Sequence, residues 1–447
     1  MRHANGGHDS AAYPRPTTAW WSVALLTLGA VLSYTDRLIL TILVDPIRAS
    51  LHLTDTQLSV VQGAAFAVIY SCIGLPLGRI ADLVPRKVLL MLAIALWSAG
   101  TAACGLVHSF GALLGARFVV GIGEAALAPA GNSLIGDYFP PDRRGMAMGV
   151  FITGIVLGVG AATAIGGGLL QLAQGSSLRV LPVIGDLAPW RIVLVLAGVA
   201  GFLMCAVMPT LHERAGRSFS PGPLRARLLQ LGEIGSVFRN HAGVLVPLYG
   251  ALAFWCIVDN ALLSWAPALL MRRFAWSPGE VGARLGAIII LTGIIGTPAG
   301  GLICDRVTAR WGMRARFPLL LIVAVGGILG IPVGVLGTSV GALASAGCWV
   351  LLSSAMGTIA VVTILDILPQ ESRGFGTATI TFNNILLGFS LGPTLVALVT
   401  DHVFHDSRAV GYAMSCIIAP CVLMSILLYA ITMVRASNLR LTSEGLT

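Results

Sequence analysis

Five charged side chains stand deep inside long apolar stretches of this sequence. They are Asp36, Arg37, Arg117, Glu124 and Asp259. A charge near the centre of a bilayer costs ~2.5–3.5 kcal/mol on insertion scales, so such residues are candidates for function. Arginine keeps its proton at ordinary pH, and its planar fork matches a carboxylate or a phosphate. We therefore predict that Arg37 binds the anionic part of a solute.

The two carboxyl groups beside these arginines suggest proton chemistry. Burial favours the neutral form of Asp36 and Glu124, whereas nearby arginines favour the charged form. This balance leads to the hypothesis that Asp36 and Glu124 couple transport to protons. The alternative is a static buried salt-bridge network that fixes helix packing, and Arg117 could instead extend towards the membrane surface. Asp259 is followed by Asn260 rather than an arginine, so a packing or water-contacting role is equally open.

The elements that must position these residues are long apolar helices. The chain has 447 residues, 56% hydrophobic content, 11% charged residues and a mean hydropathy of +0.88. A membrane-spanning helix needs roughly 20 apolar residues, and continuous runs of that length disfavour a barrel, whose strands alternate over ~10 residues. We predict twelve spans at 19–44, 57–79, 88–107, 111–136, 145–171, 190–209, 244–271, 281–304, 317–336, 342–366, 375–400 and 409–434.

The chain repeats itself at a nearly constant offset. Gly78-x-x-x-Asp82 recurs as Gly301-x-x-x-Asp305-Arg306, and Asp36 recurs as Asp259, both 223 residues later. Arg144-Gly145 recurs as Arg373-Gly374 after 229 residues. We predict an all-α membrane protein of two pseudo-symmetric six-helix bundles, with these parts: an N-terminal tail 1–18, a first half 19–209, a linker 210–242, a second half 243–434 and a C-terminal tail 435–447.

Basic residues alternate between the loops and so predict the orientation. The net charge is +9, but the arginines cluster in the loops after the second, fourth and eighth spans and in the linker, so we expect no nucleic-acid partner. The positive-inside rule places both termini and the linker in the cytoplasm. Arg272 and Arg273, after the seventh span, are the main exception. The linker is either an interfacial helix on anionic lipid or a solvated connection.

This orientation brings the charges of the first half to similar heights. At 1.5 Å per residue, Asp36 lies ~12 Å below the outer end of its span. Arg117 lies ~8–10 Å and Glu124 ~18–20 Å below the outer end of theirs. Because Arg117 and Glu124 are seven residues apart, they share one helix face. If the first and fourth spans meet, two acids and two arginines form one site.

Several stretches resemble a known family. The segment Gly78-Arg79-Ile80-Ala81-Asp82-Leu83-Val84-Pro85-Arg86-Lys87 resembles the cytoplasmic loop of the major facilitator superfamily, with Pro85 where a glycine is usual. Arg117-x-x-x-Gly121-x-Gly123 resembles that superfamily's fourth-helix motif. The resemblance implies two rocking halves around a midplane site. The candidates for cytoplasmic gating loops are then Gly78, Asp82, Arg86, Lys87, Gly301, Asp305 and Arg306. The simpler interpretation is that the charges among them only set the membrane topology.

Within the superfamily, 33–37 (Ser-Tyr-Thr-Asp-Arg) and 121–140 resemble the spinster group. This similarity implies an amphipathic anion such as a lysophospholipid, moved by proton-coupled or facilitative transport. Rivals are a symporter of small organic anions or sugar acids, a polyspecific drug–proton antiporter, and, more remotely, a membrane enzyme or a sensor. We expect a monomer in a bacterial inner membrane, with lipids as neighbours.

Other polar groups at membrane depth remain secondary candidates. Tyr70, Trp255, Asn383 and Asn384 could orient a substrate, although helix-to-helix hydrogen bonding is the commoner fate of a membrane asparagine. The glycines of span five could line a moving interface or pack tightly. Lys87 is the only lysine, the eight histidines lie in predicted loops or termini, and the eight cysteines have no paired spacing. We expect no cofactor, no metal and no nucleophile–base set, and protons as the coupling ion.

Overall fold

A computed structural model describes residues 13–175, 187–213, 237–369 and 372–437. Within those ranges the chain is helical throughout and has twelve helical segments that are long and apolar enough to span a membrane. The predicted fold class is therefore confirmed. The tails predicted at 1–18 and 435–447 and the linker predicted at 210–242 lie mostly outside the described residues.

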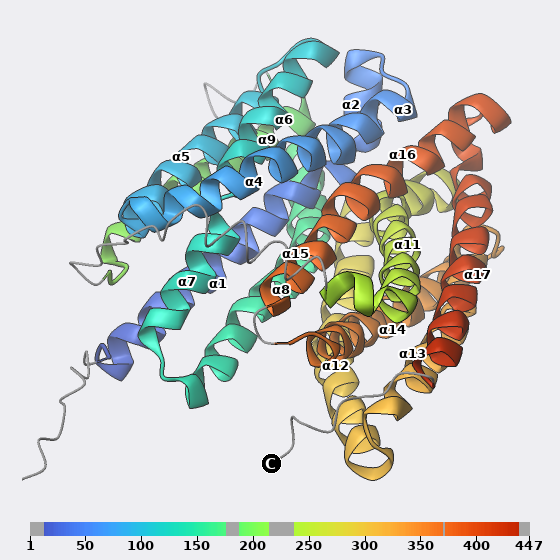
Figure 1. Cartoon of the computed structure of the whole chain (residues 1–447). Coiled ribbons are helices and arrows are strands. Elements are labelled where there is room, and N and C mark those ends of the chain that lie inside the picture. Colours follow the sequence, from blue (N-terminus) through green and yellow to red (C-terminus); the bar gives the residue numbers. More distant parts are fainter. Residues whose placement is uncertain (1–12, 176–186, 214–236, 370–371, 438–447) are drawn as a thin grey trace, which may run out of the picture.

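The helices form two groups that lie side by side (Figure 1). The first group contains α1 (Pro16–Leu38), α2 (Val44–Leu51), α3 (Asp55–Ser59), α4 (Ala65–Leu83), α5 (Arg86–Cys104), α6 (Phe110–Glu124), α7 (Leu127–Tyr138), α8 (Pro141–Gln174) and α9 (Pro189–Val207). The second contains α11 (Ala242–Phe274), α12 (Pro278–Trp311), α13 (Arg316–Gly326), α14 (Ser339–Ile367), α15 (Arg373–Phe382), α16 (Ser390–Val399) and α17 (Val410–Ala436). Short 3-10 segments continue α1 at Ile39–Thr41 and α13 at Gly327–Gly334.

The two ends of the molecule differ in how the groups meet. We call the end that carries α2 and α3 the α2–α3 end, and the end where α1 begins and α17 finishes the terminal end (Figure 1). At the α2–α3 end, one apolar cluster joins residues of both groups, among them Ile42 and Leu43 of the first and Leu262 and Trp265 of the second. The groups therefore share a core at this end.

The fourth predicted span is broken immediately after Glu124. α6 ends at Glu124 and α7 begins at Leu127. Pro129 explains the break, because proline lacks an N–H and its ring crowds the carbonyl four residues earlier, here that of Ala125. Glu124 thus lies at the point where the helix is interrupted.

Glycines of α8 pack against both groups. A Cβ on Gly154 or Gly158 would meet backbone oxygens of α1, of Thr27 and Val31 respectively, at 2.7 Å. A Cβ on Gly167 would lie 2.3 Å from the carbonyl oxygen of Pro278 on α12. The span-five glycines therefore serve packing within the first group and close contact between the groups.

Three π-helical segments interrupt the spans. They lie at Val60–Ala64, Asn383–Phe389 and Thr400–Phe404. Such segments are rare and occur frequently at functional sites. The first contacts the second, which belongs to the other group.

Candidate functional site

Arg37 and Glu124 form the centre of a buried charged site. The Nε and Nη2 atoms of Arg37 donate to Oε2 of Glu124 at 3.1 and 2.8 Å. The hydroxyl of Ser33, one helical turn before Arg37, donates to the same oxygen at 3.0 Å. The prediction that spans one and four bring these charges together agrees with this geometry.

The second oxygen of Glu124 is in a different situation. Oε1 is buried and accepts no hydrogen bond from any described residue. A buried acceptor without a partner is uncommon and calls for an explanation such as a ligand, water or a proton. Among the described residues, three hydrogen bonds reach this carboxyl group and all of them fall on Oε2, which leaves Oε1 as an open acceptor.

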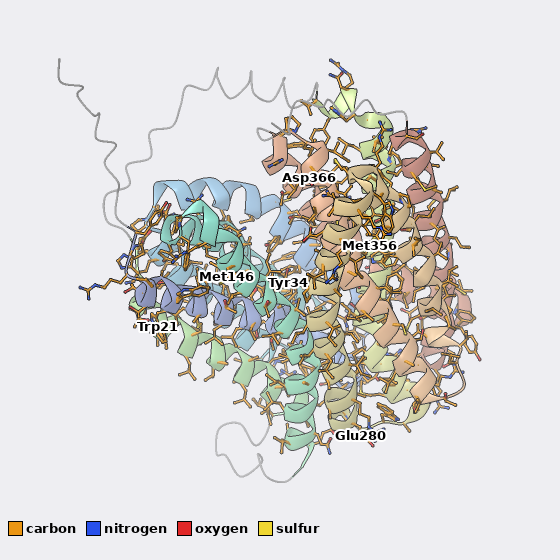
Figure 2. All side chains as sticks on the ribbon, turned by 90° about the horizontal axis from the view of Figure 1, so that it is seen from below. Trp21, Tyr34, Met146, Glu280, Met356 and Asp366 are labelled. Atoms are coloured by element: carbon orange, nitrogen blue, oxygen red, sulfur yellow. The ribbon has the colours of Figure 1, made fainter. Side chains whose placement is uncertain are left out.

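Aromatic rings surround the guanidinium group of Arg37. Its central carbon lies 4.4 Å from the ring centroid of Tyr34, 4.5 Å from that of Phe66 and 5.1 Å from that of Tyr70. Cations within about 6 Å of a ring centroid are attracted to the ring, more strongly when desolvated. In Figure 2, which views the molecule from the terminal end, Tyr34 lies close to the border between the two groups. Tyr70, a secondary candidate from the sequence, thus belongs to the site.

Arg117 holds backbone rather than a carboxylate. Its Nε donates to the carbonyl of Val61 at 3.3 Å and its Nη2 to the carbonyl of Arg37 at 3.2 Å. The residue is only 2% exposed, so its side chain does not extend to the membrane surface. Arg117 therefore ties the end of α1 to the π-helical segment before α4.

Asp36 has a hydroxyl group rather than an arginine as its hydrogen-bond partner. Its Oδ2 accepts a hydrogen bond from the hydroxyl of Thr101 on α5 at 3.1 Å. Among the described residues no arginine lies within ion-pair distance of it. The sequence placed Asp36 and Glu124 in equivalent roles, and the structure separates them.

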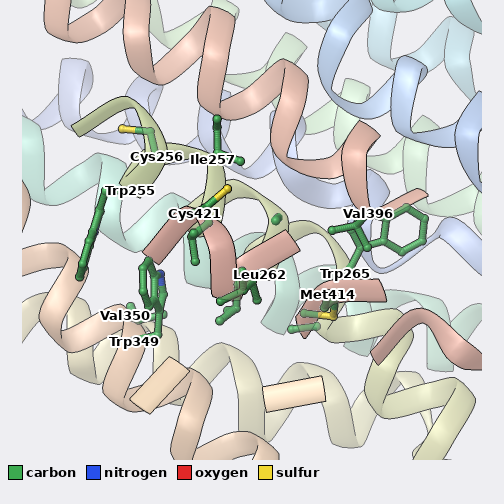
Figure 3. Packing of buried hydrophobic residues seen from close by; sticks show 14 of the residues in the cluster. Trp255, Cys256, Ile257, Leu262, Trp265, Trp349, Val350, Val396, Met414 and Cys421 are labelled. Carbon is green, nitrogen blue, oxygen red and sulfur yellow. The ribbon is translucent and has the colours of Figure 1, made fainter. Parts of the chain in front are cut away.

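The candidates of the second half form a separate polar cluster. Trp349 donates to Oδ1 of Asp259 at 3.1 Å, and Trp255 donates to the hydroxyl of Ser353 at 3.1 Å. The two tryptophan rings lie face to face (Figure 3), and their centroids are 4.4 Å apart. This arrangement gives Asp259 a partner in the packing of α11 against α14.

The two asparagines of span eleven bond to a neighbouring helix. Asn383 donates to the carbonyl of Tyr249 at 3.0 Å, and Asn384 approaches the sulfur of Cys256 at 3.8 Å. Both contacts join the π-helical segment to α11. This is the helix-to-helix alternative considered for them from the sequence.

At the terminal end, Arg86 links three segments of the first group. It donates to Ser133 at 2.8 Å and pairs with Asp137 at 2.7 Å. Glu213 accepts from the backbone N–H groups of Arg86 and Lys87 at 2.6 and 3.0 Å. Lys87 also donates to the carbonyl of Pro209. Gly78 and Asp82 lie in the last part of α4, where the structure does not describe the side-chain surroundings.

The second group has a similar ion pair at equivalent positions. Arg316 pairs with Asp366 at 2.5 Å, and these residues follow Arg86 and Asp137 by 230 and 229 positions. Asp305 and Arg306 are exposed and form no ion pair with the described residues. Asp137, Glu213, Arg316 and Asp366 were missed, although the 229-residue offset of Arg144 and Arg373 was a usable signal.

The described residues contain twelve apolar helices in two groups, with an ion pair buried between the first and fourth spans. This architecture is that of a multi-pass membrane transporter. The chain belongs to the Major Facilitator Superfamily, whose family model matches residues 26–393. It is therefore an integral membrane secondary transporter with a small-molecule substrate, and not an enzyme.

Known relatives differ in what their names say they carry. The chain is 28% identical over 428 residues to an MFS-type efflux pump of Mycolicibacterium smegmatis, covering 94% of each chain. It is 25% identical over 399 residues to a hexuronate transporter of Bacillus subtilis, covering 87% of this chain and 89% of the relative. It is 27% identical over 423 residues to a sphingosine-1-phosphate transporter of Mus musculus, covering 88% and 73%.

The fold matches a solved structure along nearly its whole length. A bacterial homologue of the human lysosomal transporter spinster, crystallised in an inward-facing and occupied conformation, aligns with a TM-score of 0.79 at 22% identity. The alignment covers 95% of this chain and 98% of that one. The resemblance to the spinster group expected from 33–37 and 121–140 is thereby confirmed.

Proposed function

We propose that this transporter binds an amphipathic anion at Arg37 and takes up a proton on Glu124 as it does so. The proposal rests on the asymmetry of this ion pair. Both hydrogen bonds from Arg37 go to Oε2 of Glu124, and Oε1 has no partner among the described residues. Protonation of Oε1 removes the negative charge that now neutralises Arg37. The guanidinium group then has a net charge to offer to a phosphate or carboxylate.

This exchange makes proton binding and anion binding support each other. Two ligands that each favour the same state of a site increase one another's affinity by the same factor. The affinity for the anion should therefore rise as the pH falls, by up to about tenfold per pH unit for one linked proton. Such mutual support is the behaviour of a proton-coupled carrier rather than of a simple facilitator.

A lysophospholipid-like solute fits the surroundings of the site. Tyr34, Phe66 and Tyr70 place apolar rings around the charged group of Arg37. An amphipathic anion can pair its head group with the arginine while its chain contacts apolar surface. The relative that carries sphingosine-1-phosphate supports this class of solute.

A sugar acid is the second candidate, because the fork of an arginine accepts a carboxylate as readily as a phosphate. The hexuronate transporter of B. subtilis supports that alternative. The similarity to the efflux pump of M. smegmatis supports drug–proton antiport as a third candidate function.

The orientation follows from the basic loops. We place both termini on the cytoplasmic side, so the α2–α3 end faces outward. We retain the division of the chain into a first half (19–209), a cytoplasmic linker (210–242) and a second half (243–434). Asp36, Arg117 and Asp259 are then supporting residues around the Arg37–Glu124 pair.

A binding experiment in nanodiscs tests the proposal. Labelled oleoyl-lysophosphatidate and labelled glucuronate are each titrated onto the protein and onto the variants Arg37→Ala and Arg191→Ala. Arg191 is a matched control, because it is a similarly buried arginine of the first group whose side chain, within the described part of the chain, donates to the carbonyl of Gly105 alone. Loss of lysolipid binding in Arg37→Ala alone supports the proposal; tight glucuronate binding would favour the sugar-acid alternative, and binding unaffected by Arg37→Ala would contradict both.

A further inference from the structure

At the α2–α3 end, an arginine of the second group forms ion pairs with two carboxylates of the first group. Arg272, in the last turn of α11, donates through Nε to Asp45 at 2.8 Å and through Nη1 and Nη2 to the two oxygens of Asp55 at 2.6 and 2.9 Å. Nη1 also donates to the carbonyl of Ser407 at 3.0 Å. All three nitrogens of the guanidinium group are therefore engaged, and two carboxylates share one cation.

This cluster is buried to an unusual degree for an ion pair near the end of a span. The side chain of Asp55 is 0% exposed and that of Arg272 6% exposed. A buried pair of this kind is costly to break by removing one partner, because the other charge is left without compensation. Asp55 without Arg272 would retain only the longer contact with Arg48, at 3.7 Å.

The next residue of the same segment makes a second contact across the groups. The backbone N–H and the hydroxyl of Thr56 both donate to Oδ2 of Asp401 at 2.7 Å. The start of α3 is itself fixed by a capping box between Thr54 and Gln57. Two consecutive residues of a rigid helix start thus bind the opposite group.

Behind these polar contacts the two groups touch without space between them. A Cβ on Gly63 would lie 2.1 Å from the carbonyl oxygen of Phe389 in the second group. In the same π-helical segment, Gln62 is 3% exposed, and neither atom of its amide group has a hydrogen-bond partner among the described residues. A buried amide without partners is unfavourable, so the arrangement seen here combines buried ion pairs with a group that would be stabilised by contact with water.

The contact between α8 and α12 is of another kind. It is lined by Gly160, Gly167, Gly282 and Gly286, whose missing side chains let the two backbones touch. Small residues allow membrane helices to approach closely. This contact can therefore rotate without separating charges, whereas the cluster at α2 and α3 cannot.

We infer that Arg272, Asp45 and Asp55 form a lock between the two halves, and that the lock must open each time the substrate site is exposed at the α2–α3 end. The inference rests on membership of the superfamily and not on the identity of the solute. It also explains why Arg272 departs from the distribution of basic residues along the sequence. Its charge is used against carboxylates of the other half.

Distance measurements between the two halves test the lock. Spin labels are attached through encoded ketone amino acids at Ser50 on α2 and Val403 in the Thr400–Phe404 segment, both exposed, so that the eight native cysteines stay in place. Double electron–electron resonance in nanodiscs then gives the distribution of distances between the labels. The unmodified protein should show mainly the short distance of the closed end.

Arg272→Gln should raise the ratio of long to short distances by about 10- to 100-fold, since two carboxylates lose their shared cation. Arg273→Gln is the matched control, because the hydrogen bonds of this neighbouring arginine to described residues go to the carbonyls of Gly334 and Val335 in its own half. Gln62→Leu should shift the distribution towards the short distance. If Arg272→Gln does not fold, Asp45→Asn with Thr56→Val replaces it and should lengthen the distance. A distribution for Arg272→Gln, or for its replacement, that matches Arg273→Gln would overturn the inference.

Discussion

Two nitrogens of Arg37 converge on a single oxygen of Glu124, at 3.1 and 2.8 Å, and the other oxygen of that carboxyl group is buried without a partner among the described residues. A symmetric, two-oxygen pairing would be the usual geometry for an arginine and a carboxylate. The asymmetry leaves one position on Glu124 for a proton, and protonation there would free Arg37.

Replacing Arg37 by lysine should not preserve binding. Lysine keeps the charge but offers a point charge on a flexible chain in place of a planar fork. We expect the affinity for the anionic solute to fall about 10- to 100-fold, the loss of one charge-assisted hydrogen bond or slightly more. Titration in nanodiscs measures the change, and an affinity equal to that of the unmodified protein would show that Arg37 does not contact the anion.

Asp36 should prove to be a supporting residue. Because Asp36 accepts a hydrogen bond from Thr101 rather than pairing with an arginine, Asp36→Ala and Thr101→Val should lower the free energy of unfolding by similar amounts, about 1 kcal/mol each. The double variant should be little worse than either single one, since both remove the same contact. The pH dependence of binding should persist in Asp36→Asn; its loss there would restore Asp36 as a coupling carboxyl.

Glu213 should stabilise the start of α5. The residue before that helix is Pro85, which has no side-chain oxygen to cap it, and Glu213 accepts from the free N–H groups of Arg86 and Lys87 instead. Glu213→Ala, which removes both acceptor oxygens, should lower the free energy of unfolding by about 1–2 kcal/mol, as for the loss of a good cap. Thermal unfolding in detergent measures it. Asp305→Asn, at an exposed position without an ion pair, is the control and should leave the melting temperature unchanged.

Two adjacent glycines of α8 should respond differently to alanine. A Cβ on Gly167 would meet the carbonyl of Pro278 at 2.3 Å and Cα of Gly282 at 3.0 Å, whereas a Cβ on Gly168 would meet nothing within 4 Å. Gly167→Ala should therefore force the two groups apart locally and slow solute flux several-fold in liposomes. Gly168→Ala should transport normally, and equal flux in the two variants would show that the α8–α12 contact tolerates separation.

The spans were predictable because lipid leaves the backbone few choices. Hydrocarbon satisfies no peptide group, so every long apolar run must form its own hydrogen bonds as a helix. The pairing of Arg37 with Glu124 was also accessible, because helix rise fixes the depth of each charge. The break after Glu124 had a visible cause in Pro129, yet a continuous apolar run concealed it.

Other features depend on tertiary contacts that no local pattern encodes. Thr101 is compatible with any membrane helix, so nothing marked it as the partner of Asp36. The π-helical segments at Val60–Ala64 and Asn383–Phe389 lie where the two groups contact each other. Arg272 stood out in the sequence because it follows an outward-running span, where few basic residues are expected. Its partners Asp45 and Asp55 belong to the other half of the chain, so the sequence did not indicate them.

The pH dependence of solute affinity in the unmodified protein and in Glu124→Gln tests the central claim most directly. The dissociation constant of the bound anion is measured in nanodiscs from pH 5 to pH 8, with Asp36→Asn as the matched carboxyl control. The Arg37–Glu124 account predicts that affinity falls as the pH rises in the unmodified protein and in Asp36→Asn. In Glu124→Gln, whose side chain carries no charge at any pH, affinity should be high and constant across the range. An unchanged pH dependence in Glu124→Gln would contradict the claim that Glu124 carries the coupled proton.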